Sequence, residues 1–251
     1  MVVPESAVTI ANGNWGATSL RAAGAVLESA AAVLCGAFGR WPDTPVHVLP
    51  GDGSPYVAWD RRPYRIWLSA RDTYWCQYAY QFSHELCHVL VNFDRIRHHR
   101  HNWFEESVCE LAALFVLIRL SERFQHRPPP EVFGAEEFAP HFATYARSIA
   151  DSVPAVPRAG LPAWLSGNLA ALETHHVDRT LNRTAAVAML DNFLDDESLW
   201  RDCVALNLWD ASADASFADH LDSWTTHLLT TKCVARTPRL VRDLFFAKRA
   251  P

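Results

Sequence analysis

The sequence predicts an α+β fold in which a small sheet and several helices come first and a mostly helical region follows. Two short segments of the first half, VHVLP (46–50) and YRIWLSA (64–70), are rich in β-forming residues and predict strands. A proline-punctuated connector occupies residues 151–162, and nearly everything after it has helical periodicity. We therefore expect two regions, 1–150 and 151–251, in a chain that is long enough to bury a substantial core.

One helix is expected before the two strands in the sequence, and another is expected after them. Residues 18–38 are alanine-rich with apolar residues at helical spacing, and Gly39 is suited to end that helix. A second helix is expected from about Thr73 to Phe93, with Asp72 as its N-terminal cap. Gly51 to Pro55, between the two strands, have the composition of a turn.

The rest of the chain continues as helices. A basic, polar loop is expected at 94–102, followed by a strong helix at 103–124 that the prolines of RPPPE (127–131) bring to an end. In the second half, Ser216 and Asp219 have the spacing of a capping box at the start of a helix.

Composition narrows the class of protein. A formal net charge of −5, with a fifth of the residues charged, gives no indication of a nucleic-acid partner or of disorder. The most apolar stretch, 22–38, is interrupted by Glu28, and we expect it to be too short to span a membrane. The first residues lack the pattern of a signal peptide, so we expect a soluble, cytoplasmic protein. The cysteines form no CxxC pair and are expected to be buried thiols of a reducing compartment: Cys35, Cys76, Cys87, Cys109, Cys203 and Cys233.

One motif carries a specific chemistry, the segment His84-Glu85-Leu86-Cys87-His88. Residues four apart on a helix differ by about 40° around its axis, so His84 and His88 point the same way and can bind one zinc ion. Glu85 is turned by about 100° from His84 and can reach a water on the open side of that ion. In a chain with twelve histidines such a motif also arises by chance, so a third ligand is the feature that discriminates.

Three groups of residues could supply the third ligand. Asp94 lies ten residues after His84, but this spacing normally places a glycine where Val91 stands, and a β-branched residue tolerates a positive φ badly. The loop histidines form the second group, and a solvated role is expected for them: His98, His99 and His101. Glu105 and Glu106 open the next helix, where acidic residues are also favoured by the helix dipole.

The motif followed by a helix with Trp103-x-x-Glu106 and a further acid at Glu110 resembles the gluzincin zinc metallopeptidases. The resemblance covers about residues 45–125. It implies that Glu106 is the third ligand of one Zn²⁺ ion, with Glu105 as the alternative, and that Glu110 orients the first histidine. It further implies a zincin-like catalytic region over 1–150 and a helical region over 151–251 that closes the cleft.

The same resemblance suggests further site residues. Zincins bind extended substrate along a strand at the edge of the sheet, which implies that Trp67, Leu68 and Ser69 bind substrate. Many members use a histidine or tyrosine to stabilise the oxyanion. We expect His176 in this role, and alternatives are His175 and Tyr145.

These expectations combine into a zinc-dependent hydrolase, most simply a metallopeptidase acting on a peptide or protein. Glu85 would take the proton of the attacking water and pass it to the leaving amine. A non-peptide amide substrate is a variant of the same hypothesis. Two alternatives remain: a catalytically inactive, zinc-stabilised binding or regulatory protein on the same scaffold, and a coincidental motif without metal.

Overall fold

A computed structural model describes residues 7–58, 62–95, 99–208 and 215–246 of the chain. It has a mixed α+β architecture, and the chain divides into two compact units. The first unit combines Met1–Leu90 with Ala112–Ile149, and the second combines Val91–Leu111 with Ala150–Pro251. The chain passes from the first unit to the second at residue 150, where the boundary was expected. Residues 91–111, which were expected in the first region, belong to the second unit.

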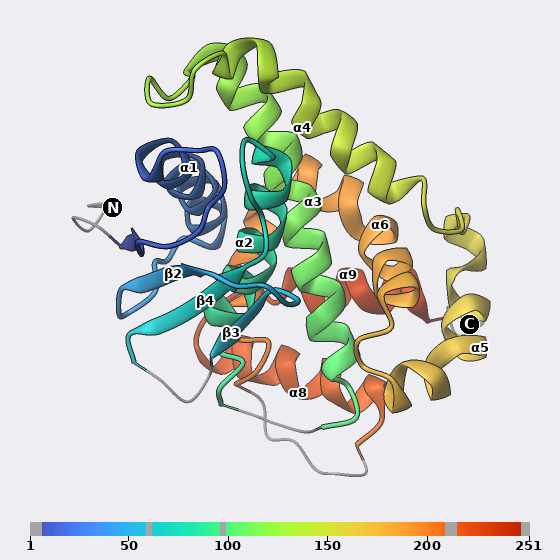
Figure 1. Ribbon diagram of the computed structural model, residues 1–251. Helices are drawn as coiled ribbons and strands as arrows, with labels where there is room; N and C mark the ends of the chain where they lie inside the picture. Colours follow the sequence, from blue (N-terminus) through green and yellow to red (C-terminus); the bar gives the residue numbers. More distant parts are fainter. Residues whose placement is uncertain (1–6, 59–61, 96–98, 209–214, 247–251) are drawn as a thin grey trace. The chain divides into compact units, whose positions relative to one another are not determined.

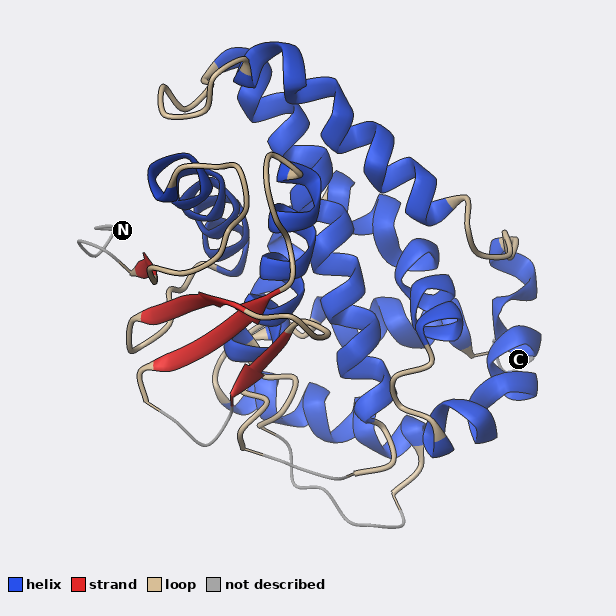
Figure 2. Cartoon of the chain, viewed as in Figure 1, coloured by secondary structure: helices blue, strands red, loops and turns tan. Residues whose placement is uncertain are grey.

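The sheet of the first unit has four strands in the order β1-β2-β4-β3. Strands β1 (Val8–Ile10), β2 (Val46–Pro50) and β4 (Tyr64–Leu68) are parallel, and β3 (Tyr56–Ala58) pairs antiparallel with β4 at the edge. Figure 2 shows these strands in red. The two strands expected from the sequence are confirmed. The other two are only three residues long, too short to leave a periodic pattern.

Helix α1 (Leu20–Phe38) confirms the first expected helix. The Ser19 side chain accepts a hydrogen bond from the backbone N–H of Ala22, and Gly39 ends the helix with φ of 69°. α1 packs on β1 and on α2, as seen at the left of Figure 1. Contrary to our expectation, it is long and apolar enough to cross a membrane by length and composition alone. Much of it is buried in the protein, as in the core helix of a soluble protein, and the cytoplasmic location stays a prediction.

Helix α2 (Trp75–Leu90) carries the motif and packs on β3 and β4. The expectation that Asp72 caps it is wrong, because the helix begins three residues later and Asp72 has φ of 53°. The Asp72 carboxylate instead accepts a hydrogen bond of 2.6 Å from the backbone N–H of Ala17, which ties the preceding loop to this end of the helix. At the other end Asn92 has φ of 60°, a conformation that asparagine tolerates better than most residues.

Helices α3 (Asn102–His126) and α4 (Ala135–Ala150) complete the first unit, and α3 runs from one unit into the other. The strong helix expected at 103–124 is thus confirmed, whereas α4 was not singled out from the sequence. Phe142 of α4 packs edge-on against Phe124 of α3, with ring centroids 5.1 Å apart and both side chains buried. This contact fixes α4 against the C-terminal half of α3.

The second unit is helical in the part that the structure describes, as expected. Its α-helices after α3 are α5 (Leu161–Thr174), α6 (Arg179–Asp195), α7 (Trp200–Cys203), α8 (Phe217–Thr230) and α9 (Arg236–Phe245), with short 3₁₀ turns at Arg158–Gly160 and Glu197–Leu199. The capping box of Ser216 and Asp219 is confirmed at the start of α8. The six cysteines of the chain are free thiols. The expectation that they are buried is confirmed for four of them and is wrong for Cys233, which is exposed, and for Cys76, which is half-buried.

Candidate metal centre

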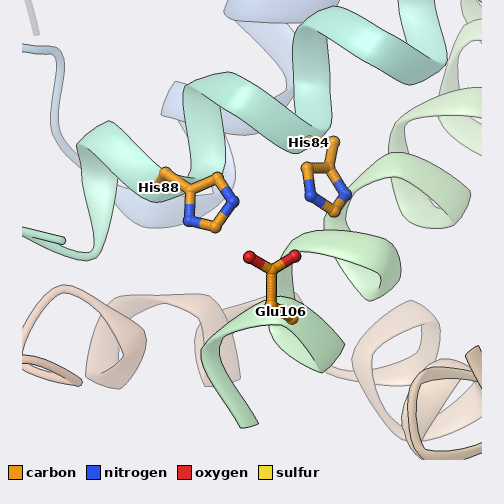
Figure 3. A group of neighbouring side chains, drawn as sticks. All are labelled: His84, His88 and Glu106. Carbon is orange, nitrogen blue, oxygen red and sulfur yellow. The ribbon is translucent and has the colours of Figure 1, made fainter. Parts of the chain in front are cut away.

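The structure brings together His84 and His88 of α2 and Glu106 of α3. Each offers one ligand atom, and these atoms lie within 4.8 Å of one another. Figure 3 shows the two imidazole rings and the carboxylate pointing toward a common point. The three residues thus form a group that could hold one metal ion, on positions expected from the sequence.

The helix itself accounts for half of this arrangement. His84 and His88 are one turn apart, and their ring centroids are 5.1 Å apart. The opposite face of the helix is anchored in the core by Phe82, Leu86 and Val89, so the two imidazoles project from a backbone that is held rigidly. Two imidazoles and one carboxylate fit a zinc ion with an open fourth position. Imidazole also suits copper, iron and nickel.

Glu85 lies beside the first histidine and is only 6% exposed. Its position on the helix turns its side chain by about 100° from that of His84. Its expected role, to take the proton of the attacking water, stays a prediction.

The structure distinguishes the two glutamates that open α3. Glu105 is buried, and its carboxylate accepts a hydrogen bond of 2.7 Å from the side-chain amide of Asn207. Glu106 is the one that belongs to the group with the histidines. Adjacent residues on a helix differ by about 100° in direction, so the two carboxylates face different partners.

Glu110 lies one helical turn after Glu106 and is also buried. Its carboxylate accepts a hydrogen bond of 3.2 Å from the guanidinium Nε of Arg183 in α6. Its expected role, to orient His84, stays a prediction. Asn207 and Arg183 could not be predicted from the sequence, because each meets its partner from more than seventy residues away.

Among the described residues, the other candidate ligands Asp94, His99 and His101 are not part of the group. Asp94 lies in the turn after α2, and His98 is outside the described residues. The expectation that His99 and His101 are solvated is wrong, since both are buried. They contact His220 of α8, and the three ring centroids are 5.6–6.2 Å apart.

Burial is the main cause that lowers the pKa values of these three histidines. Burial is the main cause of the lowered pKa of His99, which falls to about 4, and the nearby His101 and His176 lower it further. Burial also lowers the pKa of His101, and it lowers that of His220 well below the usual range. Burial therefore disfavours the charged form of each of these side chains.

His176, the expected oxyanion donor, lies close enough to His99 to affect its charge. Its backbone carbonyl accepts a hydrogen bond of 2.7 Å from the side chain of Asn182. Of the alternatives, His175 ends α5, and Tyr145 of α4 packs edge-on against Tyr80. Each remains a prediction in that role.

The substrate-binding expectation for Trp67, Leu68 and Ser69 rested on an edge strand, and this premise is wrong. Strand β4 lies between β2 and β3, so β3 forms the edge. Trp67 stacks on Tyr56 of β3 with ring centroids 4.7 Å apart. The Leu68 carbonyl accepts from Gly51, and the Ser69 N–H donates to the Gln81 side chain. These backbone groups are already paired within the protein.

No family model, no curated protein and no solved structure matches this chain. What can be said of its function therefore depends on the site itself.

Proposed function

We propose that this protein is a zinc-dependent hydrolase that cleaves peptide bonds, with a site of the gluzincin type. The observation that carries the proposal is the approach of His84, His88 and Glu106 within 4.8 Å. If the HExxH motif were coincidental, there would be no reason for a carboxylate of a second helix to lie beside its two histidines. Glu85 follows His84 directly in the sequence, the position that the general base has in an HExxH motif.

In the proposed reaction, three residues would bind zinc and Glu85 would transfer a proton. When bound by His84, His88 and Glu106, zinc would polarise the scissile carbonyl and lower the pKa of a water molecule. Glu85 accepts a proton from that water as its oxygen attacks the carbonyl carbon. As the C–N bond breaks, Glu85 delivers the proton to the departing nitrogen, so the products are a carboxylate and a free amine.

Two buried contacts support the carboxylates of α3. Asn207 holds Glu105, and Arg183 pairs with Glu110. Together they fix the side chains on either side of Glu106 along the helix. They therefore help to hold in place the turn of α3 from which Glu106 projects.

The test is to measure zinc content and peptide cleavage for the wild type and for Glu85→Gln. We expect about one zinc per chain in both proteins, and cleavage of a mixed peptide library by the wild type alone. The isosteric amide cannot accept the proton but leaves the ligands in place. Equal activity of the two proteins would refute the role of Glu85, and a folded wild type without zinc would refute the metal site.

The placement of His176 favours one competing function. It lies beside the buried His99, and its role as oxyanion donor stays a prediction. A zinc-stabilised binding or regulatory protein needs no such donor. Stoichiometric zinc in a protein that cleaves no peptide of a complete library would favour this second candidate.

A further inference from the structure

A groove of about 360 Å³ lies on the first unit, between the start of α2 and one face of α4. Its volume is within the range of ligand-binding pockets, about 300–1,000 Å³. The residues that line it are Thr73, Tyr74, Cys76, Gln77, Phe138, His141, Thr144, Tyr145 and Ser148.

The lining of this groove combines aromatic rings with neutral polar groups. Tyr74, Phe138 and Tyr145 supply the rings, and no Asp, Glu, Lys or Arg is among the described residues that line it. Burial raises the pKa of the Cys76 thiol to about 12, so this side chain is also uncharged. Apart from the imidazole of His141, this lining offers an ion no partner that would replace its hydration, so it favours an apolar or aromatic group.

The groove shares one face of α2 with the candidate metal ligands. Gln77 lies seven residues before His84, a rotation that leaves the two side chains about 20° apart around the helix axis. Tyr80, between them on the same face, packs edge-on against Tyr145 of the groove with ring centroids 6.1 Å apart. The groove and the two histidines therefore follow one another along the same face of α2.

The distance along α2 from Gln77 of the groove to His84 is about the length of a short extended peptide. Seven residues of helix rise about 10 Å, and an extended chain covers this distance in about three residues. An extended peptide whose scissile bond lies at His84 and His88 would therefore bring a side chain about three residues away to the groove.

We propose that this groove is a specificity pocket that binds an aromatic or large aliphatic side chain of the substrate, about three residues from the cleaved bond. This inference rests on the proposed peptidase function. The occupant is a substrate side chain, since the groove is aligned with the metal ligands on α2 and is open to solvent along α4, where Thr144 and Ser148 are exposed.

The test uses Thr144→Glu, which places a carboxylate in the groove at an exposed helical position that tolerates substitution. The matched control is Arg147→Gln, which changes the net charge by the same amount on an exposed residue of α4 outside the groove. Wild type and both variants are given a randomised peptide library, and the cleaved sequences are determined by mass spectrometry.

We expect the wild type and Arg147→Gln to prefer Phe, Tyr or Leu at one position about three residues from the cleaved bond. Thr144→Glu should lose at least about tenfold of that preference, the scale on which apolar pockets discriminate. It should cleave peptides with a small residue there as well as the wild type does. An unchanged preference in Thr144→Glu, or the same loss in Arg147→Gln, would overturn the inference while the peptidase function stands.

If the wild type cleaves no peptide, the proposed function fails and the groove is tested directly. N-acetyl-L-phenylalaninamide is then titrated into the three proteins, and binding is followed by saturation-transfer NMR. Binding by the wild type and Arg147→Gln, lost in Thr144→Glu, supports a site for an aromatic side chain. Absence of binding by the wild type overturns it.

Discussion

The side-chain amide of Asn207 donates a hydrogen bond of 2.7 Å to the carboxylate of Glu105, across 102 residues of sequence. Both residues are buried. This bond gives Glu105 a structural partner and leaves its neighbour Glu106 in the group with His84 and His88. The two adjacent glutamates therefore have separable roles.

Their separation predicts opposite phenotypes for two alanine variants. Glu106→Ala should lose nearly all bound zinc with little change in the free energy of unfolding without metal. Glu105→Ala should keep about one zinc per chain but lose about 1–3 kcal/mol of stability, because the buried Asn207 amide loses its acceptor. Zinc content by atomic emission and urea denaturation of the metal-free proteins measure the two effects. If Glu105→Ala lost its zinc and Glu106→Ala kept it, the third ligand would be Glu105 and our assignment of Glu106 would be wrong.

The ion pair of Arg183 and Glu110 gives a second prediction. Arg183→Met should destabilise the protein by about 3 kcal/mol, because it leaves a buried carboxylate without its cation. The double variant Arg183→Met, Glu110→Leu should recover part of that loss, since no unpaired charge remains. Urea denaturation of both variants measures the difference, and a double variant less stable than the single one would contradict this account.

Glu110 can be tested separately in its expected role of orienting His84. Glu110→Gln should lower zinc affinity by about 10–100-fold, as is typical when a carboxylate that supports a ligating histidine is replaced. Competition with a fluorescent chelator measures this affinity. An unchanged affinity would confine Glu110 to its pairing with Arg183.

The buried histidine cluster predicts acid sensitivity. In the unfolded chain these side chains titrate near 6.5, whereas the folded pKa of His99 is about 4. The unfolded state therefore binds more protons than the folded state between these values, and stability is lost as the pH falls from 6.5 toward 4. Each such histidine contributes a slope of up to about 1.4 kcal/mol per pH unit.

The His220→Leu variant should reduce this slope, because it removes one buried histidine whose pKa is lowered. His126→Leu is the control, since His126 is exposed at the end of α3. The free energy of unfolding in urea is compared at several pH values between 7.5 and 4.5. The same slope in His220→Leu as in the wild type would show that the cluster is not its source.

The side chain of Asp202 caps the start of α9, a helix that lies far from it in sequence, so its removal should destabilise the protein. Its carboxylate accepts hydrogen bonds of 2.6 and 2.9 Å from the backbone N–H groups of Arg236 and Thr237, at the start of α9. Helix α9 has no side-chain cap of its own. Asp202→Ala should therefore cost about 1–2 kcal/mol in urea denaturation, whereas Asp191→Ala, at an exposed position in α6, should cost much less.

The sequence predicted the parts of the site that depend on local geometry. His84 and His88 are aligned by the helix period, and the helix that carries Glu106 has a strong apolar pattern. The choice of Glu106 over Glu105 could not be derived from the residues alone, because it depends on Asn207. The histidine cluster was missed for the same reason, since it joins a loop to a helix more than a hundred residues later.

The fold was predicted to a similar extent. Strands β2 and β4 have five residues each and were found, whereas three-residue β1 and β3 were not. Missing β3 had a consequence for function, because it placed β4 at the edge of the sheet. A strand's position in a sheet depends on which other segments pair with it, and this is a long-range property that a single segment does not reveal.

The start of α3 also has a consequence for the order in which the site can form during synthesis. Trp103 and Phe104, just before Glu106, are buried against Phe217 and Trp224, with ring centroids 4.8 Å apart for Trp103 and Phe217 and 6.4 Å apart for Phe104 and Trp224. A ribosome has therefore made all three candidate ligands long before it makes the residues that hold this end of the helix. We expect the nascent chain to take up metal only after its C-terminal quarter has emerged.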